Sequence, residues 1–337
     1  MPLLVDLPAA RPIPYDLFAR GRTELEARRA RRMESIYHRG QDRIWDGREV
    51  LRALIEKHGE PRVEDERRRA SLAYVLSIIM WGEYAAWRVS AELADRLYEL
   101  EPRLAATSQS HDEARHFYVL HDYLLALGER PIAPDAWGRR LIELTLRTDN
   151  VSTKLLGMQL TIESIALSLF KALRDGAIEP VLSELLPYYE RDEARHVGLG
   201  HQLLPTTFAT GGRRSRLGAQ LAQTWLTITA LGELKELERH FETLGIDKFR
   251  IIDHAQDRML SNLKELELAG SARARVDWVG GVSEGLIEAL FPRRAGGGSL
   301  LARARGLAAA IHEGSMMSPE QRIQRRDPVQ FEYTDRS

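Results

Sequence analysis

The sequence contains two copies of a motif that places a carboxylate and an imidazole on one helical face. The pentapeptide Asp-Glu-Ala-Arg-His occurs at 112–116 and again at 192–196, an offset of 80 residues. Residues three apart in an α-helix point in the same direction. Each motif would therefore present one Glu and one His together, as metal ligands or as an acid and a base. The two pairs are Glu113 with His116 and Glu193 with His196.

A further glutamate belongs to each half of this repeat. At the same offset, Glu83 corresponds to Glu163, and 29 residues separate each of them from the Glu-x-x-His motif that follows. Apolar positions repeat as well, for example Leu76 with Leu156. The simplest interpretation is that each half forms two helices, related by a pseudo-two-fold axis within a four-helix bundle.

The residues around Glu83 and Glu163 indicate that both carboxylates are buried. The helical face of Glu83 carries apolar side chains such as Leu76, Ile79 and Met80, and no Lys or Arg lies within one turn of either glutamate. A buried, ionised carboxylate costs several kcal/mol unless it is paired or binds a metal. Four acids and two imidazoles in one interior therefore need a positive partner, and two divalent metal ions are the natural one.

Helical periodicity dominates the segments that must position these residues, and no run of alternating β-branched residues indicates a strand. The predicted fold class is therefore all-α. Glycines and prolines divide the chain, among them Gly59, Pro102, Gly176 and Pro205. Helices are predicted at 15–37, 47–58, 66–100, 103–128, 135–148, 152–175, 180–204, 214–244, 246–269, 272–291 and 298–313.

We predict a single elaborated domain rather than two separate ones. Its metal-binding bundle core spans 66–204, with N-terminal helices at 15–58 and C-terminal helices at 214–313. The polar segment 315–337 is predicted to be a tail. Because 221–234 is apolar over most of its circumference, the C-terminal helices are expected to add a layer, cap a substrate cavity or form a dimer face.

The composition excludes several classes of protein. The 337 residues include no cysteine, which removes disulfides, thiolate zinc sites, iron–sulfur clusters and cysteine nucleophiles. The net charge of −1 argues against nucleic-acid binding. The N-terminus does not resemble a targeting signal, and the longest apolar stretch, 72–81, is too short to cross a bilayer. We expect a soluble, cytoplasmic protein that binds neither nucleic acid nor a membrane.

With these six residues, the chain resembles the ferritin-like non-haem di-iron carboxylate superfamily. Its members take one Glu from each of two helices and a Glu-x-x-His motif from each of two others. The resemblance covers roughly residues 66–204 and implies a ferritin-like four-helix bundle with additional flanking helices. It implies that Glu113 and Glu193 bridge the metals and that Glu83 and Glu163 are terminal. The implied cofactor is two iron ions, or Mn/Fe, held by Glu83, Glu113, His116, Glu163, Glu193 and His196.

The aspartates before the motif glutamates are candidates to anchor the ligand imidazoles. A metal-bound imidazole needs a partner for its other N–H, and a carboxylate there fixes the tautomer and raises the basicity of the ligand. In similar proteins with Asp-Glu-x-x-His, the aspartate acts across the bundle. The resemblance therefore implies that Asp112 lies near His196 and Asp192 near His116.

Other residues have two interpretations. Arg115 and Arg195 either form ion pairs with these aspartates or are ordinary surface arginines. Tyr123 and Tyr189 either approach the metals or are core residues. Four residues are candidates to line a pocket beside the metals, although each has the composition of an ordinary core position: Trp87, Gln159, Phe170 and Tyr189.

The motifs also narrow the choice within the superfamily. A ribonucleotide reductase small subunit would have Asp as its first ligand and Tyr one turn after the first motif His, where this chain has Glu83 and Leu120. The segment 192–202 is similar to bacterial multicomponent monooxygenase hydroxylases. The chain length resembles the single-chain di-iron N-oxygenases, which have a third His where this chain has Tyr189. The resemblance therefore implies an O2-activating di-iron oxygenase.

Such an enzyme would oxidise a small organic substrate, by N-oxygenation of an amine or by C–H hydroxylation. The alternatives are a di-metal redox protein like a ribonucleotide reductase small subunit or a desaturase, and a non-enzymatic ferroxidase or metal-binding protein. The oxygenase interpretation implies O2, an organic substrate and an electron donor, either a ferredoxin or a reductase, as partners. We also expect a homodimer.

Overall fold

A computed structural model describes residues 24–97, 99–210, 213–269, 278–292 and 300–315. Within these ranges the chain is helical and has no strand, which confirms the predicted all-α class. The predicted helix starts at 15, 272 and 298 and the tail after 315 lie outside them. The helices are α1 (Glu24–Asp42), α2 (Gly47–His58), α3 (Glu66–Arg96), α4 (Leu100–Ala126), α5 (Ala136–Arg147), α6 (Val151–Leu155), the π-helix η1 (Leu156–Ile162), α7 (Glu163–Asp175), α8 (Pro180–Thr210), α9 (Arg213–Leu244), α10 (Lys248–Ala269), α11 (Trp278–Leu290) and α12 (Leu300–Ser315).

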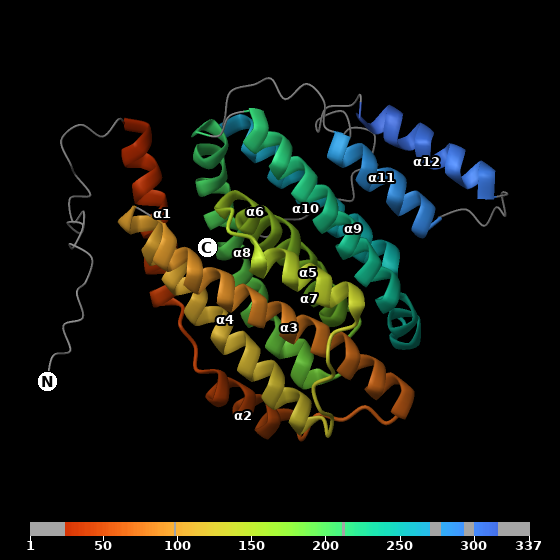
Figure 1. Ribbon diagram of the computed structural model, residues 1–337. Helices are drawn as coiled ribbons and strands as arrows, with labels where there is room; N and C mark the ends of the chain where they lie inside the picture. Colours follow the sequence, from red (N-terminus) through yellow and green to blue (C-terminus); the bar gives the residue numbers. More distant parts are fainter. Residues whose placement is uncertain (1–23, 98, 211–212, 270–277, 293–299, 316–337) are drawn as a thin grey trace, which may run out of the picture.

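Four helices form the bundle that carries the repeat. α3 packs along α4 in the first half and α7 along α8 in the second, and α8 also contacts α4 (Figure 1). Apolar side chains fill the interior in two clusters, one around Leu76 and Phe170 and the other around Val89 and Leu203. The predicted ligand positions lie between these clusters along each helix, so they are enclosed at both ends.

Polar side chains define where several of these helices begin. Asp65 accepts a hydrogen bond from the backbone N–H of Arg68 at the start of α3, and Asp135 caps α5 in the same way. The carboxylate of Glu179 accepts from the backbone N–H groups of Val181 and Leu182 at the start of α8. These contacts satisfy N–H groups that have no partner within the helix.

The remaining helices surround the bundle. α1 and α2 pack on α4 and α8, whereas α9 packs on α3 and α5, and α10 packs on α7. α11 and α12 form a pair beyond α9 (Figure 1). The C-terminal helices therefore add a layer to the bundle.

Three predicted helix ends differ in the structure. α3 ends at Arg96 and α4 begins at Leu100, so Pro102 lies in the first turn, where the N–H that proline lacks has no helical partner. α8 continues through Pro205 to Thr210 instead of ending at 204. Proline removes one bond there, and the preceding part of α8 stays buried in the core. α1 extends to Asp42 rather than 37 because no breaker precedes that position.

One helical stretch has the length and apolar composition of a membrane span, Val151–Asp175. It is longer than the apolar stretch at 72–81 that the sequence analysis singled out. In its most apolar window, 72% is buried inside the protein. The stretch is therefore a core helix of the bundle, as expected for a soluble protein.

Candidate metal centre

The six predicted ligands come together in the interior, one or two from each bundle helix. α3 supplies Glu83, α4 supplies Glu113 and His116, α7 supplies Glu163, and α8 supplies Glu193 and His196. All six are at most 4% exposed. Their ligand atoms form two groups in which all atoms lie within 4.8 Å of one another: Glu83, Glu113, His116 and Glu193, and Glu113, Glu163, Glu193 and His196.

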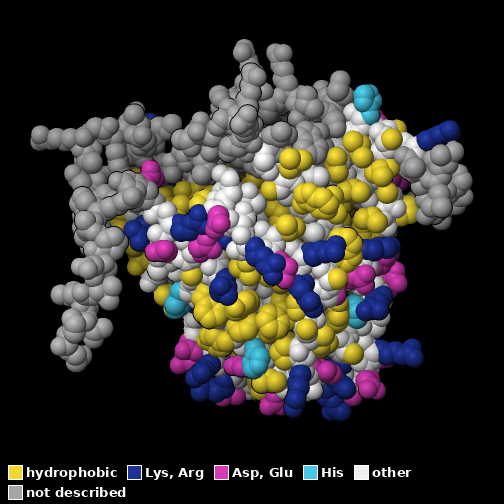
Figure 2. Space-filling model, in the orientation of Figure 1, with side chains coloured by type: hydrophobic (Ala, Val, Ile, Leu, Met, Phe, Trp, Pro, Cys, Tyr) yellow, Lys and Arg dark blue, Asp and Glu magenta, His cyan; other side chains and the backbone are white. Residues whose placement is uncertain are grey.

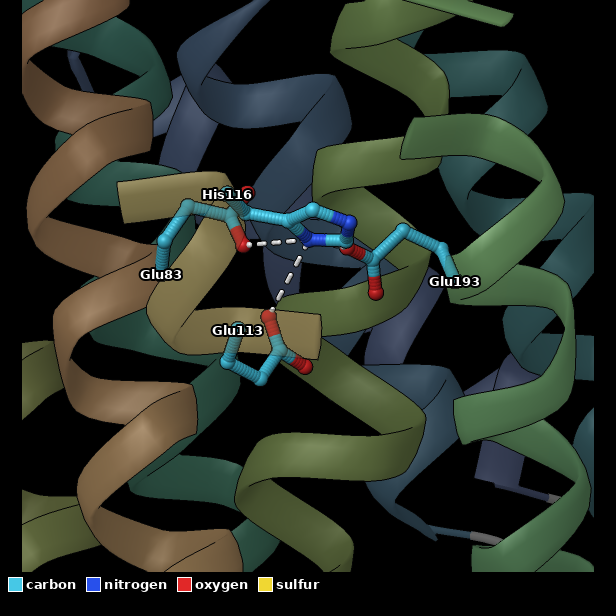
Figure 3. Close-up of side chains that lie close together, drawn as sticks. All are labelled: Glu83, Glu113, His116 and Glu193. Carbon is cyan, nitrogen blue, oxygen red and sulfur yellow. Dashed lines mark hydrogen bonds and ion pairs between the residues drawn. The ribbon is translucent and has the colours of Figure 1, made fainter. Parts of the chain in front are cut away.

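The two groups have Glu113 and Glu193 in common. Figure 3 shows the first group, in which Glu83, Glu113 and Glu193 converge on the ring of His116 from three helices. Two metal positions that share exactly these carboxylates are the arrangement in which Glu113 and Glu193 bridge and Glu83 and Glu163 are terminal.

The hydrogen bonding within the cluster leaves acceptors unsatisfied. His116 Nδ1 lies 3.3 Å from Glu83, 3.4 Å from Glu113 and 3.1 Å from Glu193. One ring nitrogen carries at most one proton, so it cannot satisfy three carboxylates. Glu113 Oε2 and Glu193 Oε1 are buried without a hydrogen-bond partner. Because oxygen and imidazole donors suit Fe and Mn, the residues fit a pair of such ions.

The pKa values show the cost of this cluster without a cation. Burial, and then the charge of Glu193, raise the pKa of Glu83 well above its usual value, and the pKa of Glu163 rises for the same two reasons. Burial opposes ionisation of Glu113 too, but the charge of His196 outweighs it and lowers the pKa of Glu113. The carboxylates in turn raise the pKa of both imidazoles against the effect of burial. The glutamates therefore draw protons into the interior, which is the role that bound metal ions would take over.

The two aspartates lie where the resemblance implies. Asp192 Oδ2 is 3.2 Å from His116 Nε2, and Asp112 Oδ2 is 3.4 Å from His196 Nε2. Each histidine thus turns Nδ1 to the cluster and Nε2 to an aspartate of the other half. Although burial opposes it, the bonds to the histidines lower the pKa of both aspartates, which keeps them ionised.

Arg115 and Arg195 complete a buried network with these aspartates and are not surface residues. Arg115 donates to Asp112 at 2.5 Å and to Asp192 at 2.9 Å. Arg195 donates to Asp192 and to Asp112, both at 2.8 Å. Each arginine therefore links the two halves of the repeat, and two positive charges balance two negative ones.

Trp45, which the sequence analysis did not single out, belongs to this network. Its Nε1 donates to Asp192 Oδ2 at 2.7 Å, and the Arg115 guanidinium lies 4.8 Å from its ring centroid. Trp45 precedes α2 and has no counterpart in the repeat, so no sequence signal marked it.

The two halves differ one turn before the motif glutamates, where Gln109 corresponds to Tyr189. Gln109 Nε2 donates to Glu163 at 2.9 Å and to Glu113 at 3.2 Å. Gln159 donates in turn to Gln109 Oε1 at 3.2 Å. The tyrosine ring instead stacks on His116, with centroids 4.4 Å apart, and its hydroxyl donates to the His116 carbonyl. The offset of 80 residues could have identified Gln109.

A buried π-helix leads into Glu163. In η1 the backbone N–H of Glu163 bonds to the carbonyl of Met158, five residues back. Such wider turns occur mostly at functional sites. Across from η1, a Cβ on Gly200 would lie 2.6 Å from the Gln159 Cβ, so only glycine permits this approach of α8. The predicted helix at 152–175 is therefore interrupted, and η1 sets the register in which Glu163 enters the cluster.

A predominantly apolar cavity adjoins the cluster. It encloses about 760 Å³, including its opening, which is within the range of small-molecule sites. Glu83 and Glu163, the predicted terminal ligands, form part of its wall, and α9 closes it with Ala230, Glu233 and Leu237.

The four predicted pocket residues do not line this cavity. Trp87 is 36% exposed at the surface, because its position on α3 lies outside the buried stripe. Phe170 is a core residue that packs on Tyr189. Gln159 and Tyr189 lie beside the ligand cluster in the roles described above. Tyr123 is hydrogen bonded to Glu179 and does not approach the cluster.

No family model and no curated protein matches the chain, but solved structures do. A protein with aldehyde deformylating oxidase activity from Synechococcus has a TM-score of 0.53 at 18% identity, over 60% of this chain and 92% of that one. Variants of an R2-like ligand-binding oxidase carrying Mn/Fe or Fe/Fe cofactors have TM-scores of 0.57 and 0.56 at 16% and 15% identity. Each covers 69% of this chain and 92% of its own.

The fold and the carboxylate–histidine cluster together define a protein of the ferritin-like di-metal carboxylate class, which confirms the expected superfamily. At these identities the likeness to the solved structures concerns the fold. The matched structures include an oxidase described as R2-like, the type that the sequence analysis kept as an alternative.

Proposed function

We propose that the protein is a non-haem di-metal oxidase that uses O2 to oxidise a small organic molecule. The observation that supports this best is the pair of ligand groups sharing Glu113 and Glu193 at the wall of an apolar cavity. The two groups would hold Fe/Fe, or Mn/Fe, and such ions supply the electron transfer that O2 reduction requires.

The chain's own residues position and insulate this centre. His116 and His196 direct Nδ1 to the cluster, and the bonds from Nε2 to Asp192 and Asp112 hold the orientation of both rings. The burial of the glutamates keeps bulk water away from their oxygens. The cavity leads an apolar molecule to Glu83 and Glu163.

The reaction that we propose is C–H hydroxylation or N-oxygenation. The apolar lining supports a largely apolar substrate, and the names of the matched oxidases, aldehyde deformylating and ligand-binding, support an organic molecule near the metals. Electrons would come from a ferredoxin or a reductase.

We also propose that the protein is a cytoplasmic homodimer. Figure 2 shows apolar side chains gathered over α3 and α4, where the rings of Trp81, Tyr84, Trp87 and Phe117 contact one another. Exposed apolar surface of this kind is typical of protein–protein contacts. Sedimentation equilibrium at micromolar concentration should give twice the chain mass, and a monomer would contradict the dimer.

The oxidase proposal is tested by loading the purified protein anaerobically with Fe(II), or with Mn(II) and Fe(II) together, and admitting O2. We expect about two metal ions per chain and, with a reductant, O2 consumption that continues over many turnovers and rises with an apolar organic compound. The matched control is Glu113→Ala, which should lose both metals and all O2 consumption.

A ferroxidase gives a different result. It would consume O2 only in proportion to added Fe(II), and no organic compound would change the rate. That result, or binding of well below two metals per chain, would rule out the oxidase.

A further inference from the structure

The cavity contains a third acidic residue, Glu233 of α9, that the centre described above does not use. It is 6% exposed, and neither carboxylate oxygen has a hydrogen-bond partner. It lies beside the first turn of α5, where a Cβ on Gly138 would be 2.9 Å from Glu233 Oε2. A buried, unpartnered carboxyl in a cavity wall is costly, and a ligand that donates to it removes the cost.

The surroundings of Glu233 favour a cationic ligand. Asp135 is the nearest influence: its Oδ1 accepts from the backbone N–H groups of Trp137 and Gly138, and its Oδ2 from the Tyr74 hydroxyl. Burial opposes this, but the bonds lower the pKa of Asp135. Burial, and then the charge of Asp135, raise the pKa of Glu233 to about 8.

The described cavity wall includes no Lys, Arg or His that could neutralise these two acids. A bound ammonium group would supply both the positive charge and the hydrogen bonds that Glu233 lacks. We propose that this cavity binds a primary amine with an apolar chain, whose ammonium group donates to Glu233. This inference rests on the proposed function and specifies its substrate class.

The orientation of the amine follows from the position of Glu233. The charges that act most on Glu233 are those of Asp135 and Glu236, whereas Glu83 responds to Glu193 and Glu113. The amine site is therefore separate from the ligand cluster. α3 lines the cavity from Ile78 to Ala86, a helical length of about 12 Å. An amine held at Glu233 thus presents carbon atoms of its chain, rather than nitrogen, to Glu83 and Glu163.

The test is calorimetric binding to the metal-free, full-length protein, which does not depend on turnover. The probes are octylamine, octan-1-ol and octanoate, which share a chain and differ in the head group. Glu233→Gln keeps the shape and removes the charge, and Glu236→Gln makes the same change at an exposed position of the same helix. Ala230→Phe fills the cavity.

We expect octylamine to bind at least about tenfold more tightly than the other two probes, and Glu233→Gln to remove that difference. Glu236→Gln should bind like the wild type, and Ala230→Phe should weaken both octylamine and octan-1-ol. Equal affinity for the three probes, preference for octanoate, no binding of octylamine, or insensitivity to Glu233→Gln or to Ala230→Phe would each overturn the proposal.

The two proposals fail separately. If the metal-free protein binds octylamine but the loaded protein shows no catalytic O2 consumption, the oxidase is wrong and the amine site stands. If the loaded protein consumes O2 but octylamine does not bind, the amine site is wrong and the oxidase stands.

Discussion

Asp192 hydrogen bonds to His116, 76 residues away, and not to His196 of its own motif. Asp112 makes the equivalent contact with His196, so each half of the repeat anchors the imidazole of the other. The two arginines of the motifs reinforce the exchange, since both bind both aspartates. The halves therefore depend on each other for the geometry of the centre.

Asp192→Asn should weaken metal binding at the position that contains His116. The neutral amide cannot stabilise the imidazole charge, and Arg115 and Arg195 each lose a carboxylate partner. Loss of such an anchoring partner typically lowers metal affinity by about 10- to 100-fold, which competitive titration with a chelating dye would measure. Asp122→Asn, at a partly exposed position of α4, is the matched control and should leave affinity unchanged.

Glu113 and Glu83 should differ in their effect on metal content. Glu113 belongs to both ligand groups and Glu83 to one. Glu113→Ala should therefore reduce metal content from two per chain to near zero, and Glu83→Ala to about one, as measured by elemental analysis. Equal losses in the two variants would show that Glu113 does not bridge.

Gly200→Ala should destabilise the protein through the contact between α8 and η1. Its Cβ would lie 2.6 Å from the Gln159 Cβ, so one of the helices must move. Overpacking of this kind costs about 1–3 kcal/mol in the free energy of unfolding. Gly198→Ala, two residues earlier, meets only Ile36 at 3.6 Å and should be neutral or slightly stabilising. Chemical denaturation compares the two, and an equal effect would argue against tight packing on η1.

Glu233 should make stability fall as pH rises. The folded protein keeps Glu233 protonated up to about pH 8, whereas the unfolded chain releases that proton near its usual value of 4.5. Between pH 5 and 8 the unfolded state therefore binds fewer protons, and folding loses about 3 kcal/mol from this one group.

Glu233→Gln removes this dependence. Urea denaturation at pH 5 and at pH 8 should show a smaller loss of stability for the variant than for the wild type, with Asp135, Glu236, Tyr74 and Arg239 unchanged around it. A wild type and a variant with parallel pH profiles would show that Glu233 is ionised in the folded protein at neutral pH.

Much of the fold and of the ligand cluster could be predicted because the information is periodic. The offset of 80 residues pairs Glu83 with Glu163 and one motif with the other, and helical spacing orients Glu113 with His116. Apolar neighbours show that these acids face inward. Such features depend only on residues within a few turns of one another and on the repeat, so the sequence alone contains them.

The tertiary structure decided what surrounds the cluster. Trp45 reaches Asp192 across 147 residues, and the cavity wall combines Glu233 of α9 with Glu83 of α3. The predicted pocket residues lay close to the ligands in sequence, but Trp87 faces the surface and Phe170 the core. Periodicity orients a side chain on its own helix, whereas the neighbour it meets depends on how distant helices pack and where a turn such as η1 widens. The sequence by itself therefore determined the predicted ligand set and the bundle, and only the packing of distant helices decided the anchoring partners and the shape of the cavity.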